Sequence, residues 1–354
     1  MNTRDRNRSI EGARAIGAFV VLMWHLNHFL DPYFEDFTFR TIFRGEWANV
    51  FFFTLSGFLT SYTRYGKSDL PSGRTFVKKR IQKIYPLWFA TILFFLVLGF
   101  AGLYSRNQLA LRTCGVLLVQ AVTDIFLIQS WIPGYPYLFE MNGPGWFLSA
   151  MLLAWILTIP LLKCVRSLKA KQQMYTVTFL LLFQTVWTWL CAENKLLSQY
   201  ATGVWWMYPL TSYLCGMIAG LKERDRCVSC VECGFASILM LLGGLILCYY
   251  VTFHAFMAEY AVVICYMIYV IRLLVNEEHP LCNMMSNKYL VMIGSLSFEI
   301  YLIHIPVTRF FEFFGFIRSG LITFCIIVAT TILLAFIWQK MMSHLLRGRK
   351  WKIL

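Results

Sequence analysis

Two ionisable side chains lie in the first apolar segment of the chain, where burial in lipid would be costly. Arg14 and His25 are separated by ten residues within IEGARAIGAFVVLMWHLNHFL. Eleven helical steps of about 100° place both side chains on one face, roughly 16 Å apart along the axis. A neutral imidazole can accept the proton of a hydroxyl, so His25 is a candidate general base. Ionisable residues inside membrane segments are usually functional, which makes this pair a candidate site.

A second apolar segment carries polar residues on one helical face. In SLSFEIYLIHIP, the positions i, i+4 and i+7 are Ser297, Tyr301 and His304. Counted from the cytoplasmic ends of their segments, His25 and His304 both fall in the outer half of the bilayer, so we expect a shared polar cavity. Ser56 interrupts an aromatic run in another segment. The structural alternative for each residue is a buried hydroxyl or imidazole that ties two helices together.

A basic stretch precedes the third apolar segment. In FVKKRIQKIYP, Arg80 and Lys83 are one helical turn apart, which predicts a cationic patch at the inner membrane surface. Such patches often bind anionic lipid and fix orientation. The functional alternative is a seat for a phosphorylated cytosolic cofactor.

Composition identifies the class of protein that must position these residues. The chain is 58% hydrophobic and 17% aromatic with 14% charged residues, which is atypical of a soluble domain. Its net charge of +14 comes from short basic clusters between apolar stretches, as in the cytoplasmic loops of multi-pass membrane proteins. Nucleic-acid binding is therefore not expected. The first apolar segment has no convincing cleavage site and is interpreted as a retained span.

Charge and apolar runs predict an all-α membrane helix bundle forming one domain over residues 1–354, with about ten transmembrane helices. The stretch 109–131 is interpreted as a re-entrant or interfacial helix, because one more crossing would place the basic loop at 163–171 outside. Both termini are expected in the cytoplasm, and the protein in the plasma or inner membrane. The predicted spans cover residues 13–30, 47–65, 85–104, 146–162, 174–192, 203–221, 234–253, 256–275, 289–312 and 320–340.

Cysteines indicate little chemistry. Most of the eleven lie in apolar segments, where a thiol acts as a small hydrophobe. Cys227, Cys230 and Cys233 form a C-x2-C-x2-C run that would need a fourth metal ligand, with Cys282 and His279 as candidates. Free thiols in a reducing compartment are the alternative, and no metal is expected.

Five sequence blocks together resemble acyltransferase family 3, a family of integral membrane proteins. In chain order they are GARA with a histidine ten residues after the arginine, FFFTLSGFL, RIQKIYP, GPGWFLSAMLLAWIL and SFEIYLIHIP. Lys83 stands where the family usually has a second arginine, so a point-charge contact replaces bidentate phosphate binding. The tryptophan block lacks the glutamate found in many members.

The resemblance implies transfer of an acyl group, most simply acetyl, from cytoplasmic acyl-CoA to a hydroxyl of an extracytoplasmic or lipid-linked glycan such as an exopolysaccharide. It implies that Arg80 and Lys83 meet the phosphates of acetyl-CoA and that Arg14 supports the cofactor arm. His25 would activate the acceptor hydroxyl.

The acceptor side of the site follows from the same resemblance. Trp146 would stack on a sugar ring, while Ser56, Tyr301 and His304 would orient the acceptor or stabilise the developing oxyanion. Two other functions remain open from the residues alone: a transporter or flippase of a glycan precursor, and a non-catalytic membrane scaffold. Oligomeric state is also open.

Overall fold

The computed structural model describes residues 3–30, 43–64, 67, 69–132, 141–194, 205–225, 234–316 and 320–345, and within these ranges all regular structure is helical. The α-helices are α1 (Thr3–Leu26), α3 (Gly45–Tyr62), α4 (Gly73–Ser105), α5 (Leu111–Phe126), α6 (Trp146–Ser167), α7 (Ala170–Glu193), α8 (Met207–Asp225), α9 (Gly234–His254), α10 (Phe256–Val275), α11 (Pro280–Met285), α12 (Lys288–Gly294), α13 (Ser297–Phe313) and α14 (Leu321–Leu345). Two short 3₁₀ helices, η1 (Asn27–Phe29) and η3 (Gly143–Gly145), follow α1 and precede α6.

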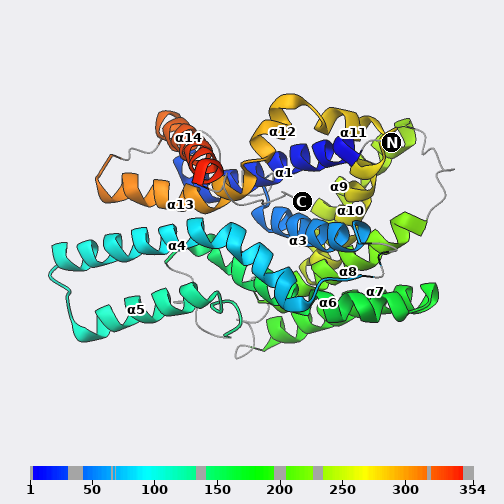
Figure 1. The fold of residues 1–354 in the computed structure, drawn as a ribbon, viewed down its shortest axis with the longest axis horizontal. Coiled ribbons are helices and arrows are strands. Elements are labelled where there is room, and N and C mark those ends of the chain that lie inside the picture. The colour runs from blue at the N-terminus through cyan, green and yellow to red at the C-terminus, as the bar shows by residue number, and fades with distance from the viewer. Residues whose placement is uncertain are drawn as a thin grey trace.

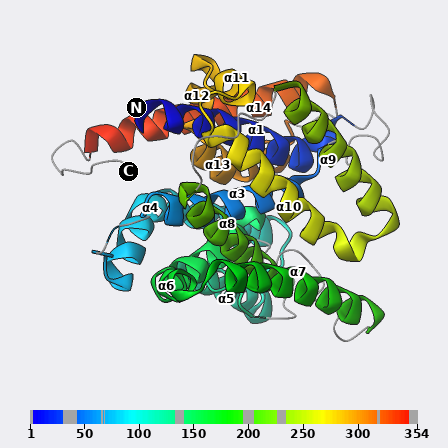
Figure 2. The ribbon, with the colours of Figure 1, turned by 90° about the vertical axis from the view of Figure 1, so that its right-hand side faces the viewer.

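Helices α3 and α8 pack against each other near the centre of the molecule, and the other long helices surround them at differing angles (Figures 1 and 2). The pairing of α3 with α8 is the most extensive in the bundle, and it depends on glycine. A Cβ at Gly57 would lie 1.9 Å from the carbonyl oxygen of Tyr213, and one at Gly216 would lie 2.1 Å from that of Thr54. These distances allow no side chain, so the two backbones are in direct contact.

Helix α1 is held by α11, α12 and α13. A Cβ at Gly12 would lie 1.8 Å from the carbonyl oxygen of Met285, and one at Gly294 would lie 1.7 Å from that of Glu11. The predicted span 289–312 is not one straight helix, because α12 and α13 meet at an angle of 60°. The bend directly follows Gly294, where the backbone of α12 touches α1. After the bend, the polar face of α13 lies beside the last turn of α1, where His304 meets His25.

Helix α4 extends well beyond the predicted span 85–104. It begins at Gly73, where the side chain of Ser72 caps it by accepting a hydrogen bond from the Thr75 backbone N–H at 3.2 Å. The helix continues through Pro86, which membrane helices tolerate. The basic stretch is therefore helical, and it presents Arg80 from the same rigid element as the apolar span.

Helix α5 turns back along α4 and ends beside its middle (Figure 1). Tyr85 of α4 donates a hydrogen bond to the carbonyl of Ile125 at 3.1 Å, and Trp88 donates one to that of Asp124 at 2.8 Å. The chain then leaves the helix while still inside the protein, since Leu127 is 1% exposed. Irregular backbone at membrane depth is tolerated where protein surrounds it. Whether α5 re-enters the bilayer, as the sequence predicts, stays a prediction.

Among the described residues, five helical stretches are long and apolar enough to cross a membrane: Gly73–Ser105, Gly143–Ser167, Ala170–Glu193, Met257–Val275 and Leu321–Leu345. The bent pair α12 and α13 is a sixth if it counts as one span. The predicted count of about ten is therefore not confirmed. Helices α1, α3 and α8 carry charged residues or hydroxyls that face other helices, which lowers their hydropathy below that of a lipid-exposed span.

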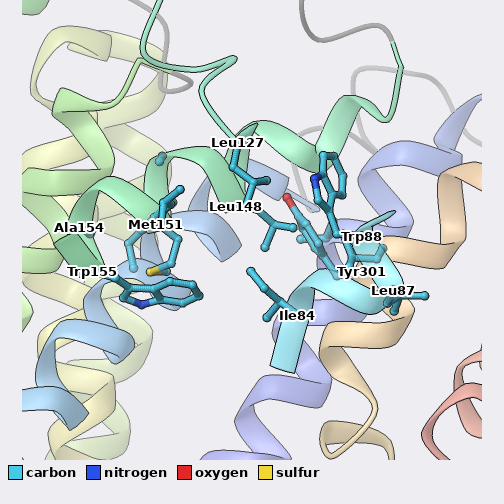
Figure 3. Packing of buried hydrophobic residues seen from close by; sticks show 14 of the residues in the cluster. Ile84, Leu87, Trp88, Leu127, Leu148, Met151, Ala154, Trp155 and Tyr301 are labelled. Carbon is cyan, nitrogen blue, oxygen red and sulfur yellow. The ribbon is translucent and has the colours of Figure 1, made fainter. Parts of the chain in front are cut away.

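The apolar interior lies between α4, α6 and α13. Figure 3 shows Ile84, Leu148 and Tyr301 in this cluster, which the indole of Trp88 closes on one side. Trp88 is completely buried. Outward-facing apolar residues are frequent on α5, α7 and α14, as expected where lipid covers the protein. The chain is thus a multi-helix membrane protein with its polar residues turned inward.

Candidate active site

The two histidines that the sequence places at similar depth are in contact. His25 lies in the last turn of α1 and His304 near the middle of α13, and their ring centroids are 5.1 Å apart. His304 is fully buried, whereas His25 is partly exposed. The two rings are therefore in contact, and His25 is the more exposed of the pair. The polar cavity that the sequence predicts around them stays a prediction.

The hydrogen bond of His304 defines which ring nitrogen can accept a proton. Its Nδ1 lies 3.2 Å from the carbonyl oxygen of Ile300, which is only an acceptor. A neutral ring that makes this bond carries its proton on Nδ1 and has a lone pair on Nε2. Nε2 is buried and has no hydrogen-bond partner among the described residues. His304 thus offers an unused acceptor atom beside His25.

A short turn before α6 is anchored to the same helix. Tyr301 donates a hydrogen bond to the carbonyl of Pro144 at 2.9 Å, and Asn142 Nδ2 donates to the carbonyl of Leu302 at 3.4 Å. At Gly145 a Cβ would lie 2.2 Å from the ring of Trp88, so only glycine fits. The GPG sequence therefore forms a tight turn that α4 and α13 fix from opposite sides.

This turn places Trp146, the first residue of α6, at the edge of an aromatic cluster. The ring centroids of Trp146 and Phe53 are 6.3 Å apart, and those of Phe147 and Tyr301 are 5.3 Å apart. Trp146 is partly exposed, so one part of its ring is open to a ligand. Ser56 is also partly exposed, one turn after Phe53 on α3, and none of the described residues hydrogen-bonds to its hydroxyl.

Arg14 lies on the same unbroken helix as His25, nearer its amino end. Its Nη1 donates to Oε1 of Glu11 at 2.7 Å, and both side chains are about one-third exposed. Glu299 of α13 lies within electrostatic range of Glu11 and of Lys83. Arg14 and Lys83 therefore belong to one charged group beside the amino-terminal parts of α1, α4 and α13.

Arg80 faces a different direction from Lys83. Its guanidinium carbon lies 3.5 Å from the ring centroid of Phe76 and 5.7 Å from that of Trp155 on α6. The hydroxyl of Tyr213 on α8 is within electrostatic range. The structure thus does not place the two basic residues in one contact set: Lys83 is exposed near α13, and Arg80 is partly buried between α6 and α8.

Sequence reasoning missed Asn142, Trp155, Tyr213 and Arg64, all of which contact or support the predicted site residues. Asn142 directly precedes GPGW, so its position in that block could have indicated it. Trp155 lies within the block GPGWFLSAMLLAWIL, which could have drawn attention to it. Tyr213 occurs in an ordinary apolar segment, and its contacts follow only from helix packing.

The cysteine run Cys227, Cys230 and Cys233 lies outside the described residues. Its two suggested partners do lie within them: Cys282 is buried, and His279 caps α11 by accepting from the Leu281 N–H at 3.2 Å. In the described ranges no three His, Cys, Asp or Glu side chains are grouped closely enough to hold a metal ion.

The described helices, the histidine pair between α1 and α13 and the basic residues of α4 are features of a multi-helix membrane protein with a polar site in its interior. The profile of the acyltransferase domain family matches residues 7–338, and the chain belongs to this family. A relative, acyltransferase MdmB of Streptomyces mycarofaciens, is 31% identical over 156 residues. That match covers 43% of this chain and 38% of the relative. No solved structure matches.

Proposed function

We propose that this protein is a membrane O-acyltransferase that moves an acyl group, most simply acetyl, from cytoplasmic acyl-CoA to a hydroxyl of an extracytoplasmic or lipid-linked glycan. Membership of the acyltransferase family and the placement of His25 support this function. The proposed setting is the plasma or inner membrane with both termini in the cytoplasm. The contact between His25 and His304 is the observation that carries the proposal, since it joins two polar elements predicted separately.

The proposed reaction is direct transfer with His25 as the general base. The acceptor oxygen forms an ester bond with the acyl carbon while the thioester C–S bond breaks. His25 takes the hydroxyl proton and returns it to the leaving thiolate. Such a base typically contributes about 10² to 10⁴ in rate. His304, packed against His25, orients its ring or accepts from the acceptor hydroxyl group.

The residues at the inner end suit a phosphorylated donor. Arg80 has no acidic partner within the described ranges, so its charge is available for the phosphates of acyl-CoA. Lys83 supplies a second positive charge at the membrane surface. Arg14, about 16 Å along the helix from His25, lies where the cofactor arm would enter. That length approximates the reach of an extended pantetheine arm.

Trp146, Ser56 and Tyr301 form the proposed acceptor side. The exposed part of the Trp146 ring offers a stacking surface for a sugar, and Ser56 a free hydroxyl. Tyr301 acts through the turn, because its hydroxyl is already bonded to Pro144. The competing function is a flippase or transporter of a glycan precursor, for which these residues would line a path and catalyse nothing.

The test is a strain in which His25→Gln replaces the wild-type protein. Mass spectrometry of the surface glycan should show loss of the acyl ester with the amount of glycan unchanged. His28→Gln is the matched control, because His28 is exposed one turn away and its ring lies against that of Phe29, away from His304. An ester that persists in the His25 variant, or glycan that no longer reaches the surface, would contradict transfer by this residue.

A further inference from the structure

Three arginines from different segments meet at the inner end of the bundle. Arg80 of α4 and Arg64, which follows α3, lie over the same ring of Phe76, with guanidinium carbons 3.5 and 5.1 Å from its centroid. Arg166 of α6 lies within electrostatic range of Arg64. The sequence patterns pointed to Arg80 but not to the other two.

The hydrogen bonds of Arg64 and Arg166 in the described ranges go to backbone carbonyls and a hydroxyl, not to carboxylates. Arg64 donates to the carbonyl of Thr60 at 3.1 Å, and Arg166 donates to the carbonyls of Arg64 and Lys67. In the part of the chain that the structure describes, no carboxylate pairs with any of the three arginines. Like charges held this close repel each other, and an anion placed among them removes the cost.

The indole of Trp155, beside Arg80, is a neutral hydrogen-bond donor. Trp155 is 8% exposed, and its buried indole Nε1–H has no hydrogen-bond partner within the described ranges. Figure 3 shows this nitrogen on the side of the ring away from Met151. Because a buried unpaired donor costs free energy, an acceptor oxygen is expected there. The Arg80 guanidinium carbon is 5.7 Å from the same ring.

We infer that Arg64, Arg80 and the indole N–H of Trp155 form one site for a phosphate group. The guanidinium groups supply charge-assisted donors, the Trp155 N–H supplies a neutral one, and the ring of Phe76 holds the two arginines side by side. Arg166 is a positioning residue: its bonds to two backbone carbonyls tie α6 to the segment that carries Arg64. The inference rests on the proposed function in taking acyl-CoA as the phosphate source. The other source with this chemistry is an anionic lipid headgroup.

The experiment measures equilibrium binding of coenzyme A to the purified full-length protein. Arg64→Gln and Trp155→Phe should each weaken binding about tenfold or more, since each removes a donor to a charged group. Arg64→Lys, which keeps the charge, should retain part of the affinity and shows that loss in the glutamine variant is not misfolding. Lys78→Gln is the control for loss of charge alone, because Lys78 is exposed on α4, the helix that carries Arg80.

If Arg64→Gln and Trp155→Phe both bind coenzyme A with wild-type affinity, the inference is overturned. This result does not depend on which acceptor the protein uses. A wild-type protein that binds no coenzyme A would instead contradict the donor of the proposed function. In that case the lipid source is tested in nanodiscs of phosphatidylglycerol or phosphatidylcholine. Thermal stabilisation by phosphatidylglycerol that is lost in Arg64→Gln supports a phosphate site filled by lipid, and no such stabilisation overturns the inference.

Discussion

Individual side chains around the histidine pair combine structural and chemical roles. Tyr301 and His304 are one turn apart on α13, yet the tyrosine bonds to the turn before α6 while the histidine contacts α1. Asn142 adds a hydrogen bond from Nδ2 to Oγ1 of Thr91 at 3.2 Å. One face of α13 therefore fixes the turn that begins α6 and supports the candidate base at the same time.

Replacing Tyr301 by phenylalanine should destabilise the protein by about 1–2 kcal/mol, because it removes the buried side-chain hydrogen bond to the Pro144 carbonyl. Thermal unfolding in detergent measures the effect. Tyr175→Phe is the control, since Tyr175 is 70% exposed and should change stability by less than about 0.5 kcal/mol. Equal stability of the Tyr301 variant and wild type would show that this bond does not hold the turn.

At this scale the sequence predicted the residues on one helical face better than the contacts between helices. The spacing of Arg14, His25 and His304 depends only on helical geometry and apolar runs, so it could be obtained in advance. The separation of Arg80 from Lys83 could not, because it depends on which neighbouring helix each side chain meets. The same reason explains why Arg64 and Trp155 went unnoticed.

Among the elements, apolar runs predicted the long helices but neither the short helix α11 nor where helices begin and bend. Helix α4 begins at Gly73 because Ser72 caps it, and charged residues can extend a helix beyond the lipid. The bend between α12 and α13 comes from the contact of Gly294 with α1, which lies far away in sequence. Long-range backbone contacts of this kind leave little trace in local composition.

Gly216→Ala should separate α3 from α8 and lower stability by about 1–3 kcal/mol, the usual cost of overpacking. Gly243→Ala is the matched control: Gly243 lies inside α9 and nothing lies within 4 Å of the added Cβ. There the greater helix propensity of alanine should leave stability unchanged or raised. Fluorescence-detected gel filtration after heating compares the two. Equal melting of both variants would contradict direct backbone contact between α3 and α8.

For the whole molecule, the membrane topology depends on whether α5 crosses the bilayer or turns back within it. At about 24 Å, a helix of this length is shorter than the roughly 30 Å of a bilayer core. Its carboxyl end packs against Tyr85 and Trp88, part-way along α4. This arrangement favours a helix that turns back within the protein, and it fits a cytoplasmic location of the loop between α6 and α7.

Reporter fusions test this orientation. Alkaline phosphatase fused after Gln108, between α4 and α5, should be active, whereas green fluorescent protein fused after Leu168, between α6 and α7, should fluoresce. The expected signals follow from α4 crossing outward and α6 crossing back. If phosphatase fused after Leu168 is active instead, and green fluorescent protein there is dark, α5 crosses the membrane completely. A fusion after Arg74 serves as the cytoplasmic control.

The buried irregular backbone after α5 has a consequence for how the protein is made. Buried backbone groups cannot remain unpaired in lipid. The last carbonyls of α5 bond to side chains of α4, which is synthesised earlier, whereas the Ser130 N–H bonds to Ser149 of α6, which is synthesised later. The turn before α6 also needs the hydrogen bond from Tyr301 of α13. We expect a nascent chain to insert its apolar helices first and to complete the candidate site only when its last third has entered the membrane.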